Sequence, residues 1–371
     1  MIYLDYSATT PVNKAVLDKF CEINQLMYGN PNSTHELGLF ANKVVAETTK
    51  SIENVLNINN HEVIYTSGAT EANNLALKGY CESYSFKGKH IITSPYEHSS
   101  VTVCLSYLAK HGYDIDVLDI DNEGNLMIDQ LEELIREDTI LVTIAAINSE
   151  LGIKQDLKKI SEIVKGYPNC KFHSDMTQAI GKIDIDVNLC DLATFSAHKI
   201  YGIKGIGALL RKKEIDLTPV IHGGKSTTIF RGGTPPAPLI YSLGIALENI
   251  YIDFYEKQVH IDELYDYLIN VLMPQIKNTH LNYKGIPNIV NISFCDLDAT
   301  ILHKALSDRQ IYVSTQTACN SESSFSQIVK KITGSDVYAK TSLRISLSYL
   351  TKKSELDELF KAIKEILNEN S

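Results

Sequence analysis

The sequence predicts an α/β fold, in which a large domain built on a mostly parallel sheet is followed by a smaller α+β domain. Seven short apolar runs alternate with amphipathic stretches, the pattern of a parallel sheet with helices on both faces. The run near residue 140 is apolar almost without interruption, as expected of a strand buried on both faces. The chain has 371 residues, more than one typical domain, so two domains are expected.

Seven strands of the main sheet are predicted, in chain order, at 61–66, 89–93, 114–118, 139–147, 170–174, 191–196 and 205–210. Apolar residues at helical spacing predict helices at 35–57 and 156–166. A Gly/Pro-rich turn region at 232–238 ends this alternation, and a long helix is expected from about 238 to 277.

The remaining sequence predicts short strands near 288–293 and 343–347, with helices near 299–309 and 354–368. We therefore place the large domain at 13–250. The smaller α+β domain is expected to combine residues 1–12 with residues 251–371.

Composition excludes several classes of protein. The formal charge is -10 and no basic tract stands out, which disfavours general nucleic-acid binding. No apolar stretch approaches the roughly 20 residues of a membrane helix, and the start does not look like a secretory leader. The seven cysteines form no CxxC pair. We expect free thiols in a reducing cytoplasm, no zinc or other metal site, and no membrane association.

A polar motif, Ser196-Ala-His198-Lys199, follows one predicted strand and precedes a glycine-rich turn. A lysine just past the carboxyl end of a strand points into the crevice where α/β folds bind ligands. Its amine could form a Schiff base with a carbonyl cofactor. On spacing alone, however, a surface lysine beside a tight turn is the favoured interpretation.

Two further strand ends carry polar residues. Asp175 could pair with a pyridinium nitrogen, although a helix N-cap is the simpler role for a lone aspartate there. The turn at 66–71 enters a helical pattern, so its backbone N–H groups could seat a phosphate or could simply be capped. Together, an amine, an acid and a phosphate seat at three strand ends indicate a cofactor site.

With these residues in view, the chain resembles the NifS/IscS-type cysteine desulfurases, pyridoxal-phosphate (PLP) enzymes of the class-V aminotransferase family and of fold type I. The matching motifs run through nearly the whole chain. They lie at 3–11, 29–38, 66–71, 97–98, 175–178, 196–202, 222–224 and 343–347.

The resemblance implies roles for individual residues. Lys199 would hold PLP covalently and later remove the Cα proton of the substrate. Asp175 would pair with the pyridine nitrogen, Gln178 would reach the phenolic oxygen, and His98 would lie against the ring face and move protons. The phosphate contacts would come from Ala69, Thr70, Ser196 and His198.

The resemblance also implies a homodimer with shared sites, because Thr234 matches a phosphate contact made by the other subunit. Arg344 matches the arginine that clamps the substrate carboxylate, a task suited to a guanidinium. Asn30 and Ser149 would complete the substrate-binding residues.

Cys319 lies in the polar segment 313–324 and matches the cysteine that attacks the substrate sulfur. The implied reaction converts L-cysteine to L-alanine and leaves a persulfide on Cys319. The 25 residues from Cys319 to Arg344 resemble a long catalytic loop that can pass sulfur to a protein acceptor. That acceptor would serve iron–sulfur cluster assembly, tRNA thiolation or another cofactor pathway. An inert loop thiol is the alternative.

Three departures from the family pattern keep other functions open. Ser149 replaces an expected asparagine, Met176 replaces a smaller residue, and the segment 223–229 lacks the usual glycine-rich sequence. A selenocysteine lyase or a transaminase on the same fold is one alternative. The other is a PLP-binding scaffold without turnover.

Overall fold

The computed structural model describes residues 1–315 and 325–370. Its main sheet has seven strands in the order β2-β8-β7-β6-β5-β3-β4. These are β2 (His61–Thr66), β3 (His90–Thr93), β4 (Asp114–Val117), β5 (Thr139–Thr143), β6 (Lys171–Asp175), β7 (Leu192–Ser196) and β8 (Gly207–Lys212). Strands β4, β3, β5, β6 and β7 are parallel, whereas β8 runs antiparallel to β2 and β7. The predicted α/β fold with a mostly parallel seven-stranded sheet is confirmed.

Strand β5 is shorter than the apolar run predicted it to be. The regular strand ends at Thr143, although residues 144–147 remain buried. After them the chain turns at Asn148, whose side-chain oxygen accepts hydrogen bonds from the backbone N–H groups of Glu150 (3.0 Å) and Leu151 (2.8 Å). The apolar run therefore marks burial beyond the point where the strand ends.

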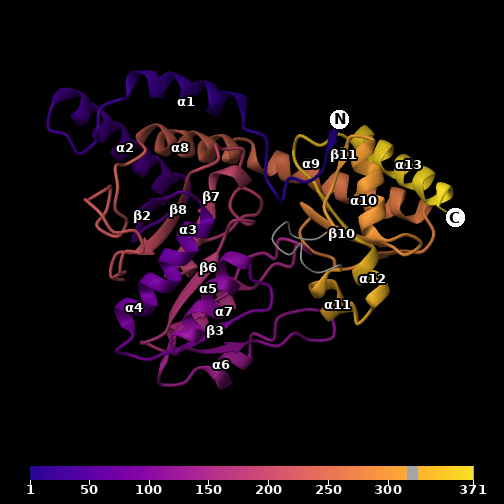
Figure 1. Cartoon of the computed structure of the whole chain (residues 1–371), viewed down its shortest axis with the longest axis horizontal. Helices are drawn as coiled ribbons and strands as arrows, with labels where there is room; N and C mark the ends of the chain where they lie inside the picture. The colour runs from indigo at the N-terminus through magenta and orange to yellow at the C-terminus, as the bar shows by residue number, and fades with distance from the viewer. Residues whose placement is uncertain (316–324, 371) are drawn as a thin grey trace.

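Helices cover both faces of this sheet (Figure 1). They include α1 (Lys14–Leu26), α2 (Glu36–Val55), α3 (Ala69–Asn74), α4 (Tyr80–Tyr84), α5 (Ser99–Lys110), α6 (Gln130–Leu134), α7 (Leu157–Lys165) and α8 (Ala237–Tyr251). Helix α3 continues through a wider turn at Leu75–Gly79 into α4, so the chain stays helical from residue 69 to residue 84. Helices α1 and α2 both pack against α8.

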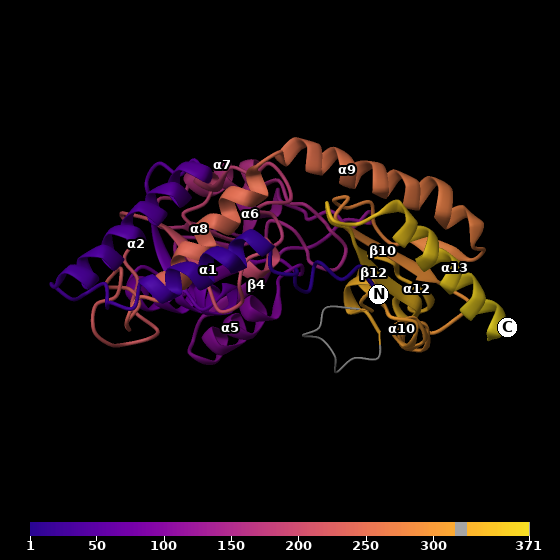
Figure 2. The ribbon, with the colours of Figure 1, turned by 90° about the horizontal axis from the view of Figure 1, so that it is seen from above.

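The single long helix predicted from 238 to 277 is wrong, because the structure has two. Helix α8 ends at Tyr251 and α9 begins at Phe254 (Phe254–Tyr267). Between them Asp253 has φ 50°, a left-handed conformation that cannot continue an α-helix. Figure 2 shows α9 running over the C-terminal part of the chain, away from α8.

The C-terminal part contains a three-stranded antiparallel sheet in the order β12-β10-β9. Its elements are β9 (Thr279–Leu281), β10 (Ile289–Phe294), α10 (Ala299–Asp308), β11 (Ile311–Tyr312), α11 (Gln327–Thr333), α12 (Asp336–Thr341), β12 (Ser342–Ser346) and α13 (Lys353–Glu369). The first strand, β1 (Ile2–Tyr3), pairs with β11, and Leu4 is fully buried in the same core as Phe360. The N-terminus thus packs with the C-terminal part, while the domain limits at 12/13 and 250/251 stay a prediction. No helix of the described residues is both long and apolar enough to cross a membrane.

Candidate active site

A cavity of about 540 Å³ lies at the carboxyl ends of β6 and β7. Arg344 of β12 also borders it, so the C-terminal part contributes to its wall. The predicted site residues that line it are Ala69, Thr70, His98, Ser149, Asp175, Gln178, Ser196, His198, Lys199 and Arg344. Cys319 lies outside the described residues.

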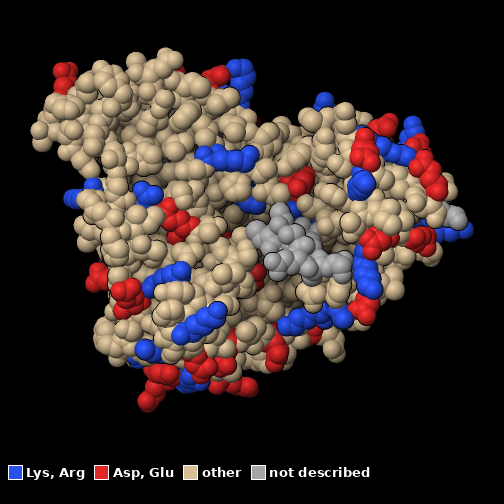
Figure 3. Space-filling model, in the orientation of Figure 1, with Lys and Arg blue, Asp and Glu red and all other residues tan. Residues whose placement is uncertain are grey.

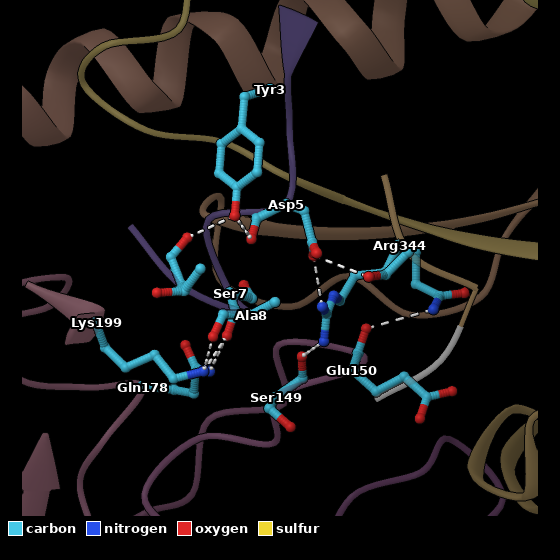
Figure 4. A network of polar contacts seen from close by, with 12 residues as sticks. Tyr3, Asp5, Ser7, Ala8, Ser149, Glu150, Gln178, Lys199 and Arg344 are labelled. Carbon is cyan, nitrogen blue, oxygen red and sulfur yellow. Dashed lines mark hydrogen bonds and ion pairs between the residues drawn. The ribbon is translucent and has the colours of Figure 1, made fainter. Parts of the chain in front are cut away.

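Lys199 ends a short helical turn directly after β7. Its ammonium donates to the backbone carbonyls of Ser7 (2.5 Å) and Ala8 (2.7 Å), as Figure 4 shows. The N-terminal segment therefore crosses the cavity wall beside the lysine. Ser7 and Ala8 were not predicted as site residues, although both belong to the matching motif at 3–11.

Asp175 is the last residue of β6 and is 6% exposed. Its Oδ1 accepts a hydrogen bond from the backbone N–H of Thr177 (2.9 Å), and its Oδ2 accepts one from Nδ2 of Asn73 (2.8 Å). Asn73 is fully buried on α3. This asparagine was not predicted from the sequence, although it follows Thr70 by three residues and so lies on the same face of a helix.

His98 is the N-cap of α5, and its Nδ1 accepts a hydrogen bond from the backbone N–H of Ser100 (3.2 Å). Burial lowers the pKa of His98, the nearby charge of Lys199 adds to this effect, and Asp175 opposes it. The imidazole is therefore neutral at pH 7 and able to donate or accept a proton at the cavity wall.

Gln178 is held at both ends of its amide. Its Nε2 donates to the carbonyl of Ser7 (2.9 Å), and its Oε1 accepts a hydrogen bond from the ammonium of Lys182. Lys182 is 8% exposed, and burial together with the charges of Lys199 and Arg344 places its pKa well below the ordinary value. No motif in the sequence signalled Lys182, because its partner is an amide and not a carboxylate.

The turn before α3 has the close packing that a phosphate seat needs. Gly68 has φ 154°, and a Cβ on Gly207 would lie 2.8 Å from the Cα of Gly68 and 2.6 Å from the carbonyl of Phe195. Glycine at position 207 thus allows β8 and this turn to be in contact. The helical stretch begins at Ala69 and Thr70, which line the cavity, so their backbone N–H groups are available to an anion there.

The same side of the cavity is electropositive. Lys199 and Lys204 both line it, and His198 lies beside them. The pKa of His198 falls to about 4 because the ring is buried and because these two lysines and Lys182 repel a second positive charge. Its Nδ1 lies 3.2 Å from Oγ1 of Thr9. The two lysines would attract an anion here, while the ring of His198 stays neutral at pH 7.

Arg344 is only 2% exposed and is fixed by two partners at the opposite side of the cavity (Figure 4). Nη2 pairs with Oδ1 of Asp5 (2.7 Å), and Nη1 donates to the carbonyl of Ser149 (3.0 Å). Its Nε has no hydrogen-bond partner among the described residues. A carboxylate in the cavity could take up this donor.

Two predicted contacts do not reach the cavity of one chain. Thr234 and Asn30 are exposed and are absent from its lining. Met176, which replaces a smaller residue and has to be accommodated near the ring, is fully buried in the hydrophobic core and does not line the cavity either. Ser149 does line it, with a shorter side chain than the family pattern has.

These side chains fit a flat pyridine aldehyde that carries a phosphate. The cavity offers an amine at Lys199, a carboxylate at Asp175 whose two oxygens already accept hydrogen bonds from backbone and amide N–H groups, and the N–H groups of a helix start. In addition, Oγ1 of Thr177 is buried at the cavity and has no partner among the described residues. A ligand there could supply one.

Comparisons with known proteins agree with this arrangement. The family model for class-V aminotransferases matches residues 2–359. The cysteine desulfurase IscS of Rickettsia prowazekii (strain Madrid E) is 38% identical over 96% of this chain and 88% of its own length. A solved NifS-like protein is 33% identical with a TM-score of 0.92, covering 99% of both chains. A structure described as SspA in complex with cysteine is 31% identical with a TM-score of 0.82, covering 95% of this chain and 100% of the other.

Proposed function

The chain belongs to the class-V aminotransferase family and is an enzyme of the cysteine desulfurase type; we propose that it works with PLP on Lys199 and stores the sulfur of L-cysteine on Cys319. The observation that carries this proposal is the convergence of Lys199, Asp175, His98 and Arg344 on one cavity.

PLP would be held by Lys199 through its aldehyde, by Asp175 through the ring nitrogen and by Gln178 through the phenolic oxygen. We assign the phosphate to the part of the cavity lined by Ala69, Thr70, Ser196 and His198. We assign His98 to the face of the ring. When bound, PLP supplies an electron sink for the charge that develops at the substrate Cα.

Side chains of the protein would bind the substrate and transfer protons. Arg344 would bind the substrate carboxylate, with Ser149 and the partner's surface near Asn30 completing the contacts. Lys199 would take the proton from Cα once the amine of the substrate has taken its place. His98, neutral at pH 7, would move a proton at the ring face.

Sulfur transfer is assigned to Cys319. Its thiolate would attack the substrate sulfur, the Cβ–S bond would break with its electrons returning to carbon, and a proton would complete L-alanine. The sulfur stays on Cys319 as a persulfide. Ser314, a described residue five positions earlier in the chain, donates to Asp5 (2.9 Å) beside Arg344, and this contact supports the assignment.

We also propose a homodimer. Helices α1 and α2 expose apolar side chains, with exposed fractions of 46% for Leu17, 58% for Leu26, 59% for Leu39 and 43% for Phe40. Figure 3 shows few charged side chains on this part of the surface. A second copy covering this face would bring a Thr234 toward each cavity. A soluble acceptor protein in a reducing cytoplasm, serving iron–sulfur assembly or thiolation, would then receive the sulfur; neither nucleic acid nor membrane is needed.

The test combines product and sulfur location. Purified protein given L-cysteine should release alanine, and mass spectrometry should find one added sulfur on the peptide that contains Cys319. Borohydride should fix the cofactor on Lys199. A transaminase would instead yield a keto acid with no need for Cys319, and a selenocysteine lyase would strongly prefer selenocysteine. A scaffold would bind PLP and release no alanine.

A further inference from the structure

A buried chain of hydrogen bonds joins Asp175, which we assign to the ring nitrogen, to His98, which we assign to the ring face. It runs from Asp175 through Asn73 and Ser100 to His98. Nδ2 of Asn73 lies 2.8 Å from Oδ2 of Asp175 and 2.8 Å from Oγ of Ser100, and Oγ of Ser100 lies 2.9 Å from Nδ1 of His98. Both linking residues are buried.

The direction of each hydrogen bond follows from the donors available. Both oxygens of the Asp175 carboxylate accept, so the amide group facing it must be the NH₂ of Asn73. The other end of that amide, Oδ1, then accepts from Oγ1 of Thr194 (2.5 Å), whose hydroxyl can donate to it. The second N–H of Asn73 is therefore donated to Ser100 Oγ.

Ser100 then has a single hydroxyl proton left to give. The backbone N–H of Ser100 donates to Nδ1 of His98, so this nitrogen is an acceptor. The hydroxyl proton of Ser100 is therefore also directed at Nδ1, while its Oγ accepts from Asn73. Because Nδ1 accepts from both groups, it carries a lone pair, and the proton of the neutral imidazole must lie on Nε2.

We propose that Asn73 and Ser100 form a positioning bridge that links the carboxylate of Asp175 to His98. The bridge fixes the imidazole of His98 in the tautomer with its proton on Nε2. The helix N-cap does not require the bridge, since the backbone N–H of Ser100 alone satisfies that role. The hydroxyl adds a second donor to Nδ1 and so strengthens the preference for the tautomer with its proton on Nε2. This deepens the proposed function and rests on it only for the catalytic use of the Nε2 proton.

The test is the tautomer itself, measured by NMR on ¹⁵N-histidine-labelled full-length protein with its cofactor as purified, with His98→Gln to assign the signal. Wild-type protein should show Nδ1 unprotonated and Nε2 protonated. Ser100→Ala should mix the tautomers and raise the pKa of His98 by about 0.7 unit, the size expected for losing one hydrogen bond to the unprotonated nitrogen. Asp175 and Lys199, the charged groups acting on His98, are left in place.

Three further variants complete the test. Ser99→Ala, the neighbouring serine, should leave tautomer and pKa unchanged. Ser100→Thr should restore both, because it returns a hydroxyl. Thr194→Val frees the amide of Asn73 without touching the surroundings of His98, so it should move the tautomer in the same direction and also serves if Ser100→Ala does not fold.

The bridge is refuted if wild-type His98 carries its proton on Nδ1, or if Ser100→Ala and Thr194→Val both leave the tautomer and the pKa as in wild type. Neither result depends on turnover. If the tautomer behaves as expected but no alanine forms from cysteine, the proposed function fails while the bridge stands.

Discussion

The cavity floor, where Asp175 and Gln178 lie, and the exposed face that carries Asn30 and Thr234 differ in how complete they are within one chain. At the floor, Asp175 and Gln178 each have hydrogen-bond partners for both polar atoms of the side-chain terminus. On the exposed face, Asn30 and Thr234 carry predicted contacts but reach no cavity. The floor is complete within a single chain, whereas we expect the outer contacts to need a second copy.

This difference separates two kinds of site residue. Residues at strand ends are positioned by the sheet and by buried partners, so their loss should abolish chemistry in each subunit. We propose that residues on the exposed face act only in an assembly, so their loss should be repairable by a partner chain. The following experiments, ordered by expected effect, test that division.

The largest effect is expected for Lys199→Ala. Without the amine, neither covalent attachment of PLP nor Cα proton removal is possible. Alanine formation should therefore fall below detection, and the absorption band of PLP attached to a lysine should be absent. Absorption spectra and an alanine assay measure both. Lys213→Ala, an exposed lysine near the end of β8, should behave as wild type. A reduced adduct on Lys204 would contradict the assignment.

Cys319→Ser should separate the ring chemistry from sulfur transfer. PLP binding and the spectral change on adding L-cysteine should persist, while alanine formation falls by orders of magnitude, because a hydroxyl is a far poorer nucleophile than a thiolate. Cys21→Ser, at an exposed cysteine on α1, is the matched control. Turnover like wild type in Cys319→Ser, or added sulfur on Cys21 or Cys295, would overturn the role of Cys319.

Six of the seven sheet strands were predictable as buried runs with a β-rich pattern bounded by turns, and the exposed edge strand β4 was predictable from its alternating polar and apolar residues. Strand ends then located Lys199, Asp175 and Thr70 without knowledge of the fold, and the family resemblance added His98 and Arg344. The break at Asp253 was not predictable, because the apolar spacing continues through it and one left-handed residue decides it.

The supporting residues were harder to predict for a different reason. Asn73, Ser100 and Lys182 act through contacts between elements far apart in sequence, and Asn73 and Asp175 are separated by 102 positions. A single polar residue on a buried helix face carries no periodic signal. Only the three-dimensional structure shows which partner it meets.

Arg344→Lys should weaken substrate binding while leaving the floor intact. The planar guanidinium of Arg344 pairs with Asp5 and Ser149 and still has a donor in a fixed direction for a carboxylate. The ammonium of a lysine is a point charge and cannot make all of these contacts at once. KM for L-cysteine should rise about 10- to 100-fold, the range for losing a charge-assisted hydrogen bond, with PLP affinity unchanged. Arg309→Lys, in a partly exposed surface ion pair, is the control. A normal KM would remove Arg344 from substrate binding.

Mixing two inactive variants tests whether the exposed face completes the site. Lys199→Ala and Thr234→Ala chains, exchanged to equilibrium, should give half mixed dimers, each with one undamaged site, so activity should return to about a quarter of wild type. Native mass spectrometry confirms the exchange. With mixed dimers present, an absence of recovery would show that Thr234 does not serve the partner's cavity.

The smallest effect concerns the ion pair that links the two regions. Glu71, in the first turn of α3, bonds through Oε1 to Nε of Arg231 (2.9 Å), three residues before Thr234, and its Oε2 accepts from the N–H of Ser67 (2.8 Å). Burial alone would raise the pKa of Glu71, but the bonds from Arg231 and Ser67 outweigh it and lower the pKa below its ordinary value of 4.5. The pair therefore stabilises the fold above about pH 4.5, the ordinary glutamate range, and this stabilisation is lost as the pH falls through the lowered pKa.

Glu71→Gln should accordingly reduce stability at pH 7 by about 1 kcal/mol, discounted for partial exposure, and the difference from wild type should vanish once the pH lies below the lowered pKa of Glu71. It should also weaken PLP binding about two- to fivefold, because Arg231 no longer holds the loop carrying Thr234 against the cavity helix. Glu62→Gln breaks a comparable pair with Arg211 between β2 and β8. This control should cost similar stability and leave PLP affinity unchanged. Equal PLP affinity in both variants would mean that the Glu71–Arg231 pair supports the fold alone and does not couple the exposed face to the cavity.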